Sequence, residues 1–354
     1  MEPKLERIDT PDFEEVYKVT EKESGLIAII AIHSTVMGPA CGGVRLYHYD
    51  SFDSALTDVL KLAEGMTYKT LSSGVKLGGG KSVIIWDTNK PVPEKLLQAF
   101  AKAVNQLNGR YFTAEDVGIS LDNLLVIKQT TPYTLGVETD LDNKTPSPFT
   151  AWGTFRSIQS VLYKLNYSNS FENKTVAIQG LGKVGSIIAE LLFWHGAHLI
   201  VTDSDKEKVR FITKRFKAQA VLPDQIYSVP CDVFSPCAMG GSLNLKTIPQ
   251  LRCKAVAGCA NNQLATPECG QLLKQRNILY APDFIANAGG LINISFEASE
   301  NGYDPKLARK SVHQIYDKLL KIYTLAEQQN STTSETAMNI AHETLNQAKS
   351  LLLK

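Results

Sequence analysis

Residues 175–185 read TVAIQGLGKVG, an apolar run of strand length that leads into three glycines spaced Gly-x-Gly-x-x-Gly. Helical apolar spacing follows over residues 187–192, and a second apolar run over residues 198–202 ends at Asp203. Strand, glycine turn, helix and strand form a βαβ unit, and an acid after its second strand is typical of dinucleotide-binding folds. The stretch therefore predicts a Rossmann-type, doubly wound parallel sheet.

Each glycine of this turn has its own expected role. Gly180 permits the tight turn, Gly182 lets a pyrophosphate approach the backbone, and Gly185 lets the following helix pack on the strand. The start of that helix offers unpaired N–H groups and the positive end of its dipole. The rest of the expected cofactor-binding loop consists of Leu181, Lys183 and Val184.

The acid after the second strand predicts which dinucleotide binds. The Asp203 carboxylate is expected to accept hydrogen bonds from the adenosine ribose hydroxyls, and its charge repels a 2′-phosphate. Ser204 and Asp205 follow it, where an arginine would accommodate that phosphate. We therefore expect NAD, rather than NADP, as the cofactor.

The length of 354 residues exceeds the usual size of one hydrophobic core and predicts two domains. Residues 130–148 are rich in Thr, Pro, Asp and Asn, which is typical of a linker. Ser147 is expected to cap the helix that follows. Further strand candidates extend the parallel sheet at 232–234, 255–258 and 278–280. The expected division is an α/β domain over 1–146, the Rossmann domain over 147–330, and a helix over 331–354 that returns to the first domain.

Composition excludes several classes of partner. The 37 basic and 36 acidic residues nearly balance, so no electrostatic field favours nucleic acid or an anionic membrane surface. The charged N-terminus lacks an apolar signal core, and no run approaches the ~18 apolar residues that span a bilayer. The six cysteines lack zinc-type spacing and the six histidines are scattered, so we expect a cytoplasmic protein with reduced thiols and no metal site.

A second informative stretch, residues 66–81, reads MTYKTLSSGVKLGGGK. A predicted helix over 54–68 ends at Lys69, and three glycines precede Lys81 and a predicted strand over 83–86. We expect both lysines at element ends, with the glycines allowing a small ligand to approach the backbone. The residues alone leave open a tight turn with two solvated lysines.

Two further turns add candidate groups to this half of the chain. Residues 37–45, MGPACGGVR, follow an apolar run over 25–32 and predict exposed backbone at a strand end. Residues 108–118, NGRYFTAEDVG, predict a strand that runs into Glu115 and Asp116. Acids at the end of a strand are often functional in α/β folds, although solvated loop acids are commoner.

Nine motifs in order resemble the amino acid dehydrogenase family of glutamate, leucine, phenylalanine and valine dehydrogenases. They are GPACGGVR, MTYK, GGGK, NGRYFTAEDVG, SPFTAWG, AIQGLGKVG, PCAMGG, AGCANNQL and YAPDFIANAGGLIN, between about Ile27 and Lys321. The resemblance implies an N-terminal substrate-binding, catalytic and oligomerisation domain beside the NAD-binding domain, in a homo-oligomer of two or more chains. The implied reaction is reversible oxidative deamination of an L-amino acid to a 2-oxo acid, ammonium and NADH.

The resemblance also assigns roles to single residues. It implies that Lys69 binds the substrate carboxylate, that Lys81 is the catalytic base acting through water, and that Asp116 handles protons at the amino group. The other implied contacts are Gly42 and Gly43 at the substrate, and Thr150 and Asn262 at the cofactor.

The residues implied around the substrate side chain are Cys41, Ala114, Leu291 and Ile294. None carries a charge, which argues against glutamate and favours leucine and other branched-chain amino acids. A phenylalanine, tryptophan or valine dehydrogenase on the same fold stays open. A catalytically silent NAD-binding regulator is a remote alternative, because the expected base, anchor and acid are all present.

Overall fold

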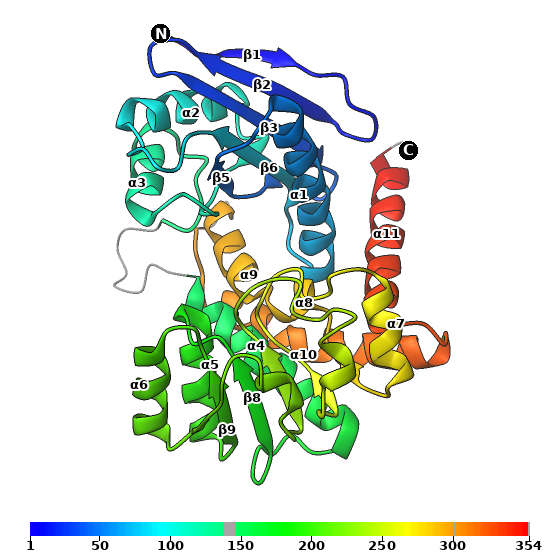
Figure 1. Cartoon of the computed structure of the whole chain (residues 1–354). Helices are drawn as coiled ribbons and strands as arrows, with labels where there is room; N and C mark the ends of the chain where they lie inside the picture. Colours follow the sequence, from blue (N-terminus) through cyan, green and yellow to red (C-terminus); the bar gives the residue numbers. More distant parts are fainter. Residues whose placement is uncertain (138–145, 300–301, 353–354) are drawn as a thin grey trace. The chain divides into compact units, whose positions relative to one another are not determined.

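The computed structural model describes residues 1–137, 146–299 and 302–352 (Figure 1). It divides into two compact units. The first contains residues 1–145, 294–303 and 341–354, and the second contains residues 146–293 and 304–340. Within the described residues, no helix is both long enough and apolar enough to cross a membrane.

The described part of the first unit contains a seven-stranded mixed sheet in the order β1-β2-β3-β6-β4-β7, with β5 also paired to β6. The strands β1, β2, β3 and β6 are mutually antiparallel neighbours, whereas β4 and β5 run parallel to β6, and β7 runs parallel to β4. The strands are β1 Lys4–Arg7, β2 Glu15–Glu21, β3 Leu26–Ser34, β4 Ala40–Cys41, β5 Val44–Tyr47, β6 Gly78–Ile85 and β7 Tyr111–Phe112.

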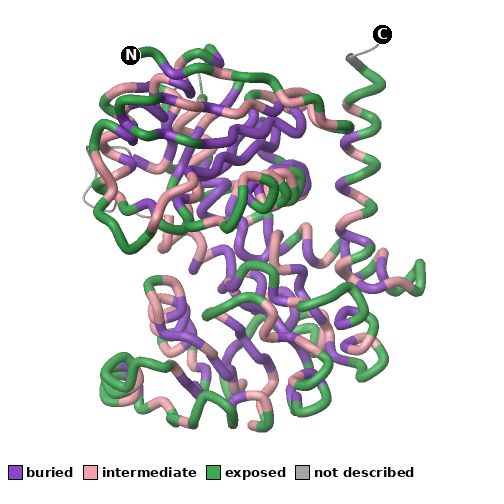
Figure 2. Tube along the Cα trace, turned by 45° about the horizontal axis from the view of Figure 1, so that its top comes forward, coloured by how far each residue is buried: buried purple, intermediate pink, exposed green. Residues whose placement is uncertain are grey.

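Helices cover both faces of this sheet. They are α1 Phe52–Ser73, α2 Glu94–Gln106 and α3 Leu121–Thr130. Because successive side chains of a strand point to opposite faces, Ile30 of β3 packs with Phe100 of α2, while Ile29 packs with Val59 of α1. Figure 2 shows buried residues running through these strands. The apolar run expected over 25–32 is therefore a strand buried on both faces.

The glycine triplet occupies a different place from the one expected. Gly78, Gly79 and Gly80 lie inside β6 rather than in a turn, and the space of their missing side chains is filled by protein. A Cβ on Gly79 would lie 2.1 Å from the backbone nitrogen of Thr67 in α1. The glycines thus let α1 pack directly on the strand, and the alternative of a tight turn is wrong. The approach of a ligand to their backbone stays a prediction.

The two lysines also lie at positions in their elements other than those expected. Lys69 lies inside α1, which continues to Ser73 and ends where Gly74 takes a φ of 70°. Lys81 lies inside β6. Neither lysine stands at an element end, because the strand begins at the glycines and the helix runs one turn further than its apolar pattern indicates.

Gly79→Ala is expected to lower the free energy of unfolding by about 3 kcal/mol, since its methyl group would overlap the backbone of α1. Gly65→Ala is the matched control, because Gly65 is exposed in the same helix and no described heavy atom lies within 4 Å of its added Cβ. That change is expected to stabilise the chain by up to about 1 kcal/mol through helix propensity. Urea unfolding of both variants would measure the difference, and equal midpoints would contradict the packing argument.

The described part of the second unit contains a six-stranded parallel sheet in the order β10-β9-β8-β11-β12-β13. The chain runs outward from β8 through β9 to β10 and then crosses back to β11, so the switch point of the doubly wound fold lies between β8 and β11. The expected Rossmann-type sheet is confirmed. Its strands are β8 Thr175–Gln179, β9 His198–Thr202, β10 Gln219–Ala220, β11 Val233–Pro236, β12 Ala255–Val256 and β13 Leu279–Tyr280.

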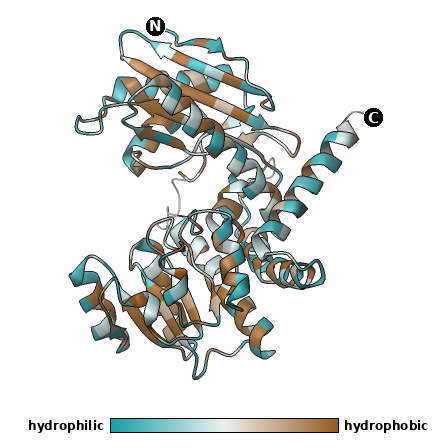
Figure 3. Cartoon of the chain, turned by 45° about the vertical axis from the view of Figure 1, so that its right-hand side comes forward, coloured by the Kyte–Doolittle hydropathy of each residue, from teal (hydrophilic) through white to brown (hydrophobic). Residues whose placement is uncertain are grey.

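Helices flank this second sheet. Helix α4 packs against α5 and α10, while α7 and two 3₁₀ turns cover an apolar cluster that includes Phe234 and Leu273. Figure 3 shows mostly hydrophobic colours on the strands of each unit. The α-helices are α4 Ser147–Asn166, α5 Lys183–Trp194, α6 Lys206–Phe216, α7 Glu268–Gln275, α8 Asp283–Ala286, α9 Gly289–Ser295 and α10 Pro305–Gln328. The 3₁₀ helices are η1 Ile226–Ser228, η2 Ile248–Gln250 and η3 Phe296–Ala298.

The last helix, α11 Thr333–Leu352, begins in the second unit and ends in the first. Thr332 and Glu335 form a capping box at its start, with the Glu335 carboxylate accepting from the Thr332 N–H over 2.9 Å. In the first unit, His342 of this helix lies against Tyr68 of α1, with ring centroids 4.5 Å apart. Ser147 is the first residue of α4 rather than its cap, which is Pro146. Residues 138–145 of the expected linker lie outside the described residues.

Candidate active site

Lys81 lies in the middle of β6, where its backbone pairs with Ala31 of β3. Its side chain is 7% exposed, and its Nζ lies 2.6 Å from Oδ2 of Asp116. A buried ammonium needs a counter-charge, because taking an unpaired charge out of water is very costly. The structure thus brings the expected base and the expected acid into direct contact.

Arg45 holds the same carboxylate oxygen from another direction. Its Nε donates to Oδ2 of Asp116 over 3.2 Å, and its Nη1 donates to Oδ2 of Asp58, in α1, over 2.9 Å. Tyr49 donates to this Asp58 oxygen over 2.6 Å. Burial disfavours the Arg45 charge, yet Asp116 and Asp58 outweigh it and raise the pKa of Arg45. This network, Lys81–Asp116–Arg45–Asp58, joins β6, β5 and α1.

Gly42 and Gly43 allow the acid segment and β6 to approach each other. A Cβ on Gly43 would lie 2.5 Å from the carbonyl oxygen of Glu115, and one on Gly42 would lie 1.8 Å from that of Gly80. Both glycines are buried rather than exposed at a strand end. Their role at the substrate stays a prediction; their effect on packing is to bring Asp116 within reach of Lys81.

Lys69 is half-buried in α1, and α1 packs on β6. Lys69 and Lys81 therefore lie on neighbouring elements of one unit. The carbonyl oxygen of Lys69 accepts a hydrogen bond from Oγ of Ser73 over 2.6 Å, as part of the last helical turn. The expected contact of Lys69 with a substrate carboxylate stays a prediction.

The residues expected around the substrate side chain fall in both units. Cys41 in β4 and Ala114 after β7 are buried in the first unit, which also contains the half-buried Ile294. Leu291 is buried in the second unit. Burial raises the pKa of the Cys41 thiol to about 12, although Lys81 acts in the opposite direction. Cys41 therefore presents a neutral surface, and the pocket assignment stays a prediction.

Three residues of this site were not predicted from the sequence: Arg45, Asp58 and Tyr111. Tyr111 is fully buried in β7, and its hydroxyl donates to the carbonyl oxygen of Gly42 and contacts Oγ of Ser82 at 2.9 Å. The position of the charged Arg45 between the apolar Val44 and Leu46 could have indicated a functional residue in this strand. Asp58 offered none, because an acid on an amphipathic helix is usually solvated.

In the second unit, each of the three glycines in the turn after β8 meets a different physical requirement. Gly180 has a φ of 98°, a left-handed conformation that favours glycine. A Cβ on Gly185 would lie 2.0 Å from the carbonyl oxygen of Gly180. By contrast, no described heavy atom lies within 4 Å of a Cβ on Gly182, so the backbone there faces open space.

The start of α5 completes a site that fits a dinucleotide. Gly182 is its N-cap and supplies no side-chain hydrogen bond, while Lys183 and Val184 begin the helix. Oδ2 of Asp203, after β9, accepts from the N–H of Leu181 over 2.6 Å, which ties the turn to the next strand. Open backbone, an uncapped helix start and a carboxylate after the second strand are the features that a dinucleotide requires.

Asp203 is charged at neutral pH. Burial acts to raise its pKa, but hydrogen bonds from the N–H groups of Leu181 and Asp205 outweigh burial and lower it. Two other expected cofactor contacts belong to the same unit. Thr150 donates from Oγ1 to the carbonyl oxygen of Pro146 over 3.1 Å, and Asn262 is exposed with a φ of 51°. Their contact with the cofactor stays a prediction.

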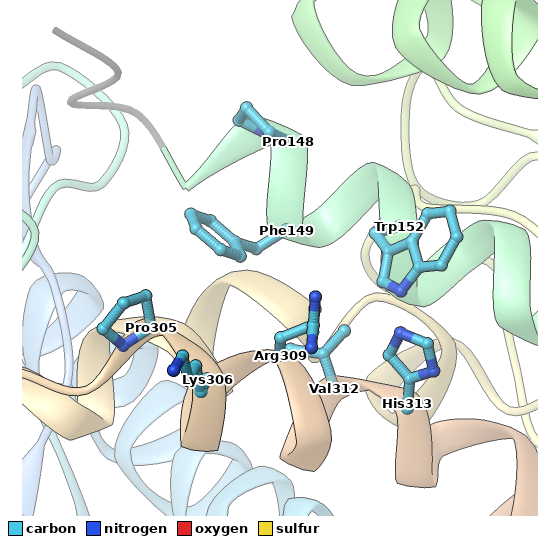
Figure 4. Close-up of a pocket in the computed structure, with 8 residues that line it drawn as sticks. All are labelled: Pro148, Phe149, Trp152, Pro305, Lys306, Arg309, Val312 and His313. Atoms are coloured by element: carbon cyan, nitrogen blue, oxygen red, sulfur yellow. The ribbon is translucent and has the colours of Figure 1, made fainter.

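A pocket of about 410 Å³ lies elsewhere in the second unit, between the starts of α4 and α10 (Figure 4). Trp152 and His313 face each other across it with ring centroids 5.3 Å apart. None of its lining residues belongs to the expected site. They are Pro148, Phe149, Trp152, Pro305, Lys306, Arg309, Val312 and His313.

Family models match most of the chain. Residues 14–133 match the Glu/Leu/Phe/Val dehydrogenase dimerisation domain, and residues 145–209 and 199–351 match Glutamate/Leucine/Phenylalanine/Valine dehydrogenase. The chain belongs to the Glu/Leu/Phe/Val dehydrogenase family. The resemblance expected from the ordered motifs is thereby confirmed, and amino acid dehydrogenases of this family generally use NAD or NADP.

Relatives within the Glu/Leu/Phe/Val dehydrogenase family align over nearly the whole chain. Leucine dehydrogenase of Geobacillus stearothermophilus is 44% identical over 98% of this chain and 95% of its own. Phenylalanine dehydrogenase of Caldalkalibacillus thermarum is 41% identical over 94% of this chain and 91% of its own. The crystal structure of L-tryptophan dehydrogenase from Nostoc punctiforme matches with a TM-score of 0.86 and 40% identity, over 96% of this chain and 97% of that chain.

Proposed function

We propose that the protein catalyses the NAD-dependent oxidative deamination of L-leucine and other branched-chain L-amino acids, reversibly, to 2-oxo acids, ammonium and NADH. The observation that carries the proposal is the buried contact between Lys81 and Asp116, in a chain 44% identical to a leucine dehydrogenase. A buried base in contact with an acid is what proton transfer at an amino-bearing carbon requires. The dinucleotide-binding features of the second unit supply the other half of the reaction.

Bound NAD supplies the acceptor for the hydride that leaves the substrate's α-carbon. Lys81, once neutral, takes a proton from a water molecule as that water adds to the imine carbon. Asp116, 2.6 Å from Lys81 Nζ, takes up or returns the proton at the substrate nitrogen. Arg45 keeps the Asp116 carboxylate in place through its contact with Oδ2. The overall change converts an amino acid, NAD⁺ and water to a 2-oxo acid, ammonium, NADH and a proton.

Lys69 has a separate task in this proposal. A charged ammonium binds the α-carboxylate that every substrate of this class carries, and it must therefore stay protonated. Lys69 is only half-buried, whereas Lys81 is buried against Asp116. The different exposure of the two side chains supports giving the charged role to Lys69 and the proton-accepting role to Lys81.

Cofactor choice follows from the charge on Asp203. We expect kcat/KM with NAD to exceed that with NADP by about 100-fold, because the carboxylate would repel a 2′-phosphate by about 2.7 kcal/mol. Asp203→Ser should lower the ratio of kcat/KM with NAD to kcat/KM with NADP, mainly by raising the value with NADP. Glu207→Ser, an exposed acid in the following helix, is the control and should leave the ratio unchanged. Equal rates of the unaltered protein with the two cofactors would contradict the argument.

Substrate choice follows from the neutral side chains expected around the substrate. The tryptophan and phenylalanine dehydrogenases among the relatives favour a second candidate, an enzyme for aromatic amino acids. Initial rates of NADH formation with leucine, isoleucine, valine, phenylalanine, tryptophan and glutamate distinguish the two. We expect the three branched-chain substrates to have the highest kcat/KM and glutamate the lowest. A higher kcat/KM for phenylalanine or tryptophan than for the branched-chain substrates would instead identify an enzyme for aromatic amino acids.

Assembly is also part of the proposal. The match of residues 14–133 to a domain described as a dimerisation domain supports a homo-oligomer. Light scattering of the purified protein should give a mass of at least twice the chain mass of 38.9 kDa. A monomer at the concentrations used for the rate assays would contradict this part of the proposal.

A further inference from the structure

Four of the six cysteines form two pairs that flank the neighbouring parallel strands β11 and β12. Val233 lies opposite Ala255 in this sheet, and a further bridge joins Pro230 to Arg252. The same register places Cys231 opposite Cys253 where the two strands begin. Past the strands the register shifts by one residue, because the N–H of Ala260, rather than that of Cys259, donates to the carbonyl oxygen of Pro236 over 3.0 Å. The thiols of Cys237 and Cys259 remain in contact there.

The pair at the carboxyl ends, Cys237 and Cys259, is close enough to bond. Neighbouring strands lie about 4.8 Å apart, within the range of Cα separations that disulfides span. Gly258 strengthens this proximity, because a Cβ on it would lie 2.2 Å from the carbonyl oxygen of Pro236. Both cysteines are free thiols and half-buried, so that a small oxidant can reach them.

The thiols of this pair also interact with each other. A hydrogen bond from Cys259 lowers the pKa of Cys237, and the same contact raises the pKa of Cys259. Oγ of Ser235 lies 3.4 Å from Sγ of Cys237 and adds a second polar neighbour. A thiolate is the form that reacts with peroxides, so Cys237 is the residue of the pair that reacts first.

This pair adjoins the glycine turn. The backbone N–H of Cys237 donates to the carbonyl oxygen of Gln179, the last residue of β8, over 2.7 Å. Its Cβ lies 3.3 Å from the position that a Cβ on Gly185 would take. The next residue, Ala238, lies 2.8 Å from the equivalent position on Gly180. A change in the backbone at Cys237 is therefore passed directly to the turn.

We propose that Cys237 and Cys259 form a reversible disulfide under peroxide and that this bond weakens dinucleotide binding by shifting the glycine turn. The Cys237 thiolate attacks hydrogen peroxide, which gives a sulfenic acid and hydroxide. The Cys259 thiol then displaces water from the sulfenic acid and forms the S–S bond. A dithiol such as dithiothreitol reverses the step and is itself oxidised to a disulfide. The weakening of binding rests on the proposed function, whereas the disulfide itself does not.

Peptide mapping tests the bond. Trypsin releases Cys231 and Cys237 in residues 218–246, Cys253 in residues 253–254, and Cys259 together with the buried Cys269 in residues 255–274. After peroxide and alkylation without reduction, we expect residues 218–246 to be linked to residues 255–274, and dithiothreitol to separate them. The link should disappear in Cys259→Ser and persist in Cys231→Ser, the matched control within the same tryptic peptide. Its absence from the unaltered protein, or its survival in Cys259→Ser, would overturn the proposal.

Calorimetry of NAD binding tests the consequence. The cross-linked protein is expected to bind NAD about tenfold more weakly than the reduced protein, and dithiothreitol should restore the affinity. Cys231→Ser should show the same loss and recovery. Equal affinities of the reduced and cross-linked forms would overturn the effect on binding. A reduced protein that does not bind NAD would instead contradict the proposed function, while the peptide map still decides the disulfide.

Discussion

Lys81→Ala is expected to lower kcat for leucine oxidation by about 10⁴-fold, because no other group would take the proton from the attacking water. NAD affinity should change little, since Lys81 belongs to the first unit and the dinucleotide-binding turn to the second. The Asp116 carboxylate would keep its contact with Arg45, so the variant should still fold. Initial rates of NADH formation and calorimetry of NAD binding measure the two quantities.

The control for this variant is Lys76→Ala. Lys76 is an exposed lysine shortly before β6, and its loss should leave kcat within about twofold, as for most exposed residues outside a site. If Lys81→Ala kept a tenth of the kcat of the unaltered enzyme, Lys81 would not be the catalytic base. A parallel loss of NAD affinity and thermal stability would point to a folding defect rather than lost chemistry.

Asp116→Asn is expected to lower kcat by about 10³-fold. The amide keeps the shape of the side chain but cannot take up a proton, and it leaves the buried Lys81 ammonium without its counter-charge. Initial rates of NADH formation over a range of leucine concentrations measure kcat and kcat/KM of the variant.

The neighbouring acid provides a close control. Glu115 is exposed, whereas Asp116 is half-buried and contacts two cations. Glu115→Gln should keep kcat within about twofold. If both substitutions reduced kcat equally, the contact seen at Asp116 would not explain its importance, and the catalytic role of the acid segment would need another residue.

The second unit could be predicted from the sequence because its signals are local. The strand over 175–179, the glycine turn and Asp203 lie within about thirty residues, and each has a periodicity or a backbone requirement of its own. Helix α6 and the short strands β10 and β13 are weaker signals, because they are brief or largely polar. Even there, the alternation of strands and helices was enough to indicate a doubly wound sheet.

The first unit was harder to predict, because its site depends on contacts distant in sequence. Arg45 and Asp116 are 71 positions apart, and no local pattern connects them. The glycine triplet was misread for the same reason: the atoms that require glycine at position 79 belong to Thr67 in a helix, not to a ligand. The family resemblance supplied the separate roles of Lys81 and Asp116, which spacing could not, whereas their direct contact was not predicted.

The most direct test of the proposed reaction is product analysis with L-leucine and NAD. We predict NADH, ammonium and the 2-oxo acid of leucine in equal amounts, with all three falling together in Lys81→Ala. NADH formation without ammonium, or no turnover of any branched-chain amino acid by the folded protein, would contradict the account.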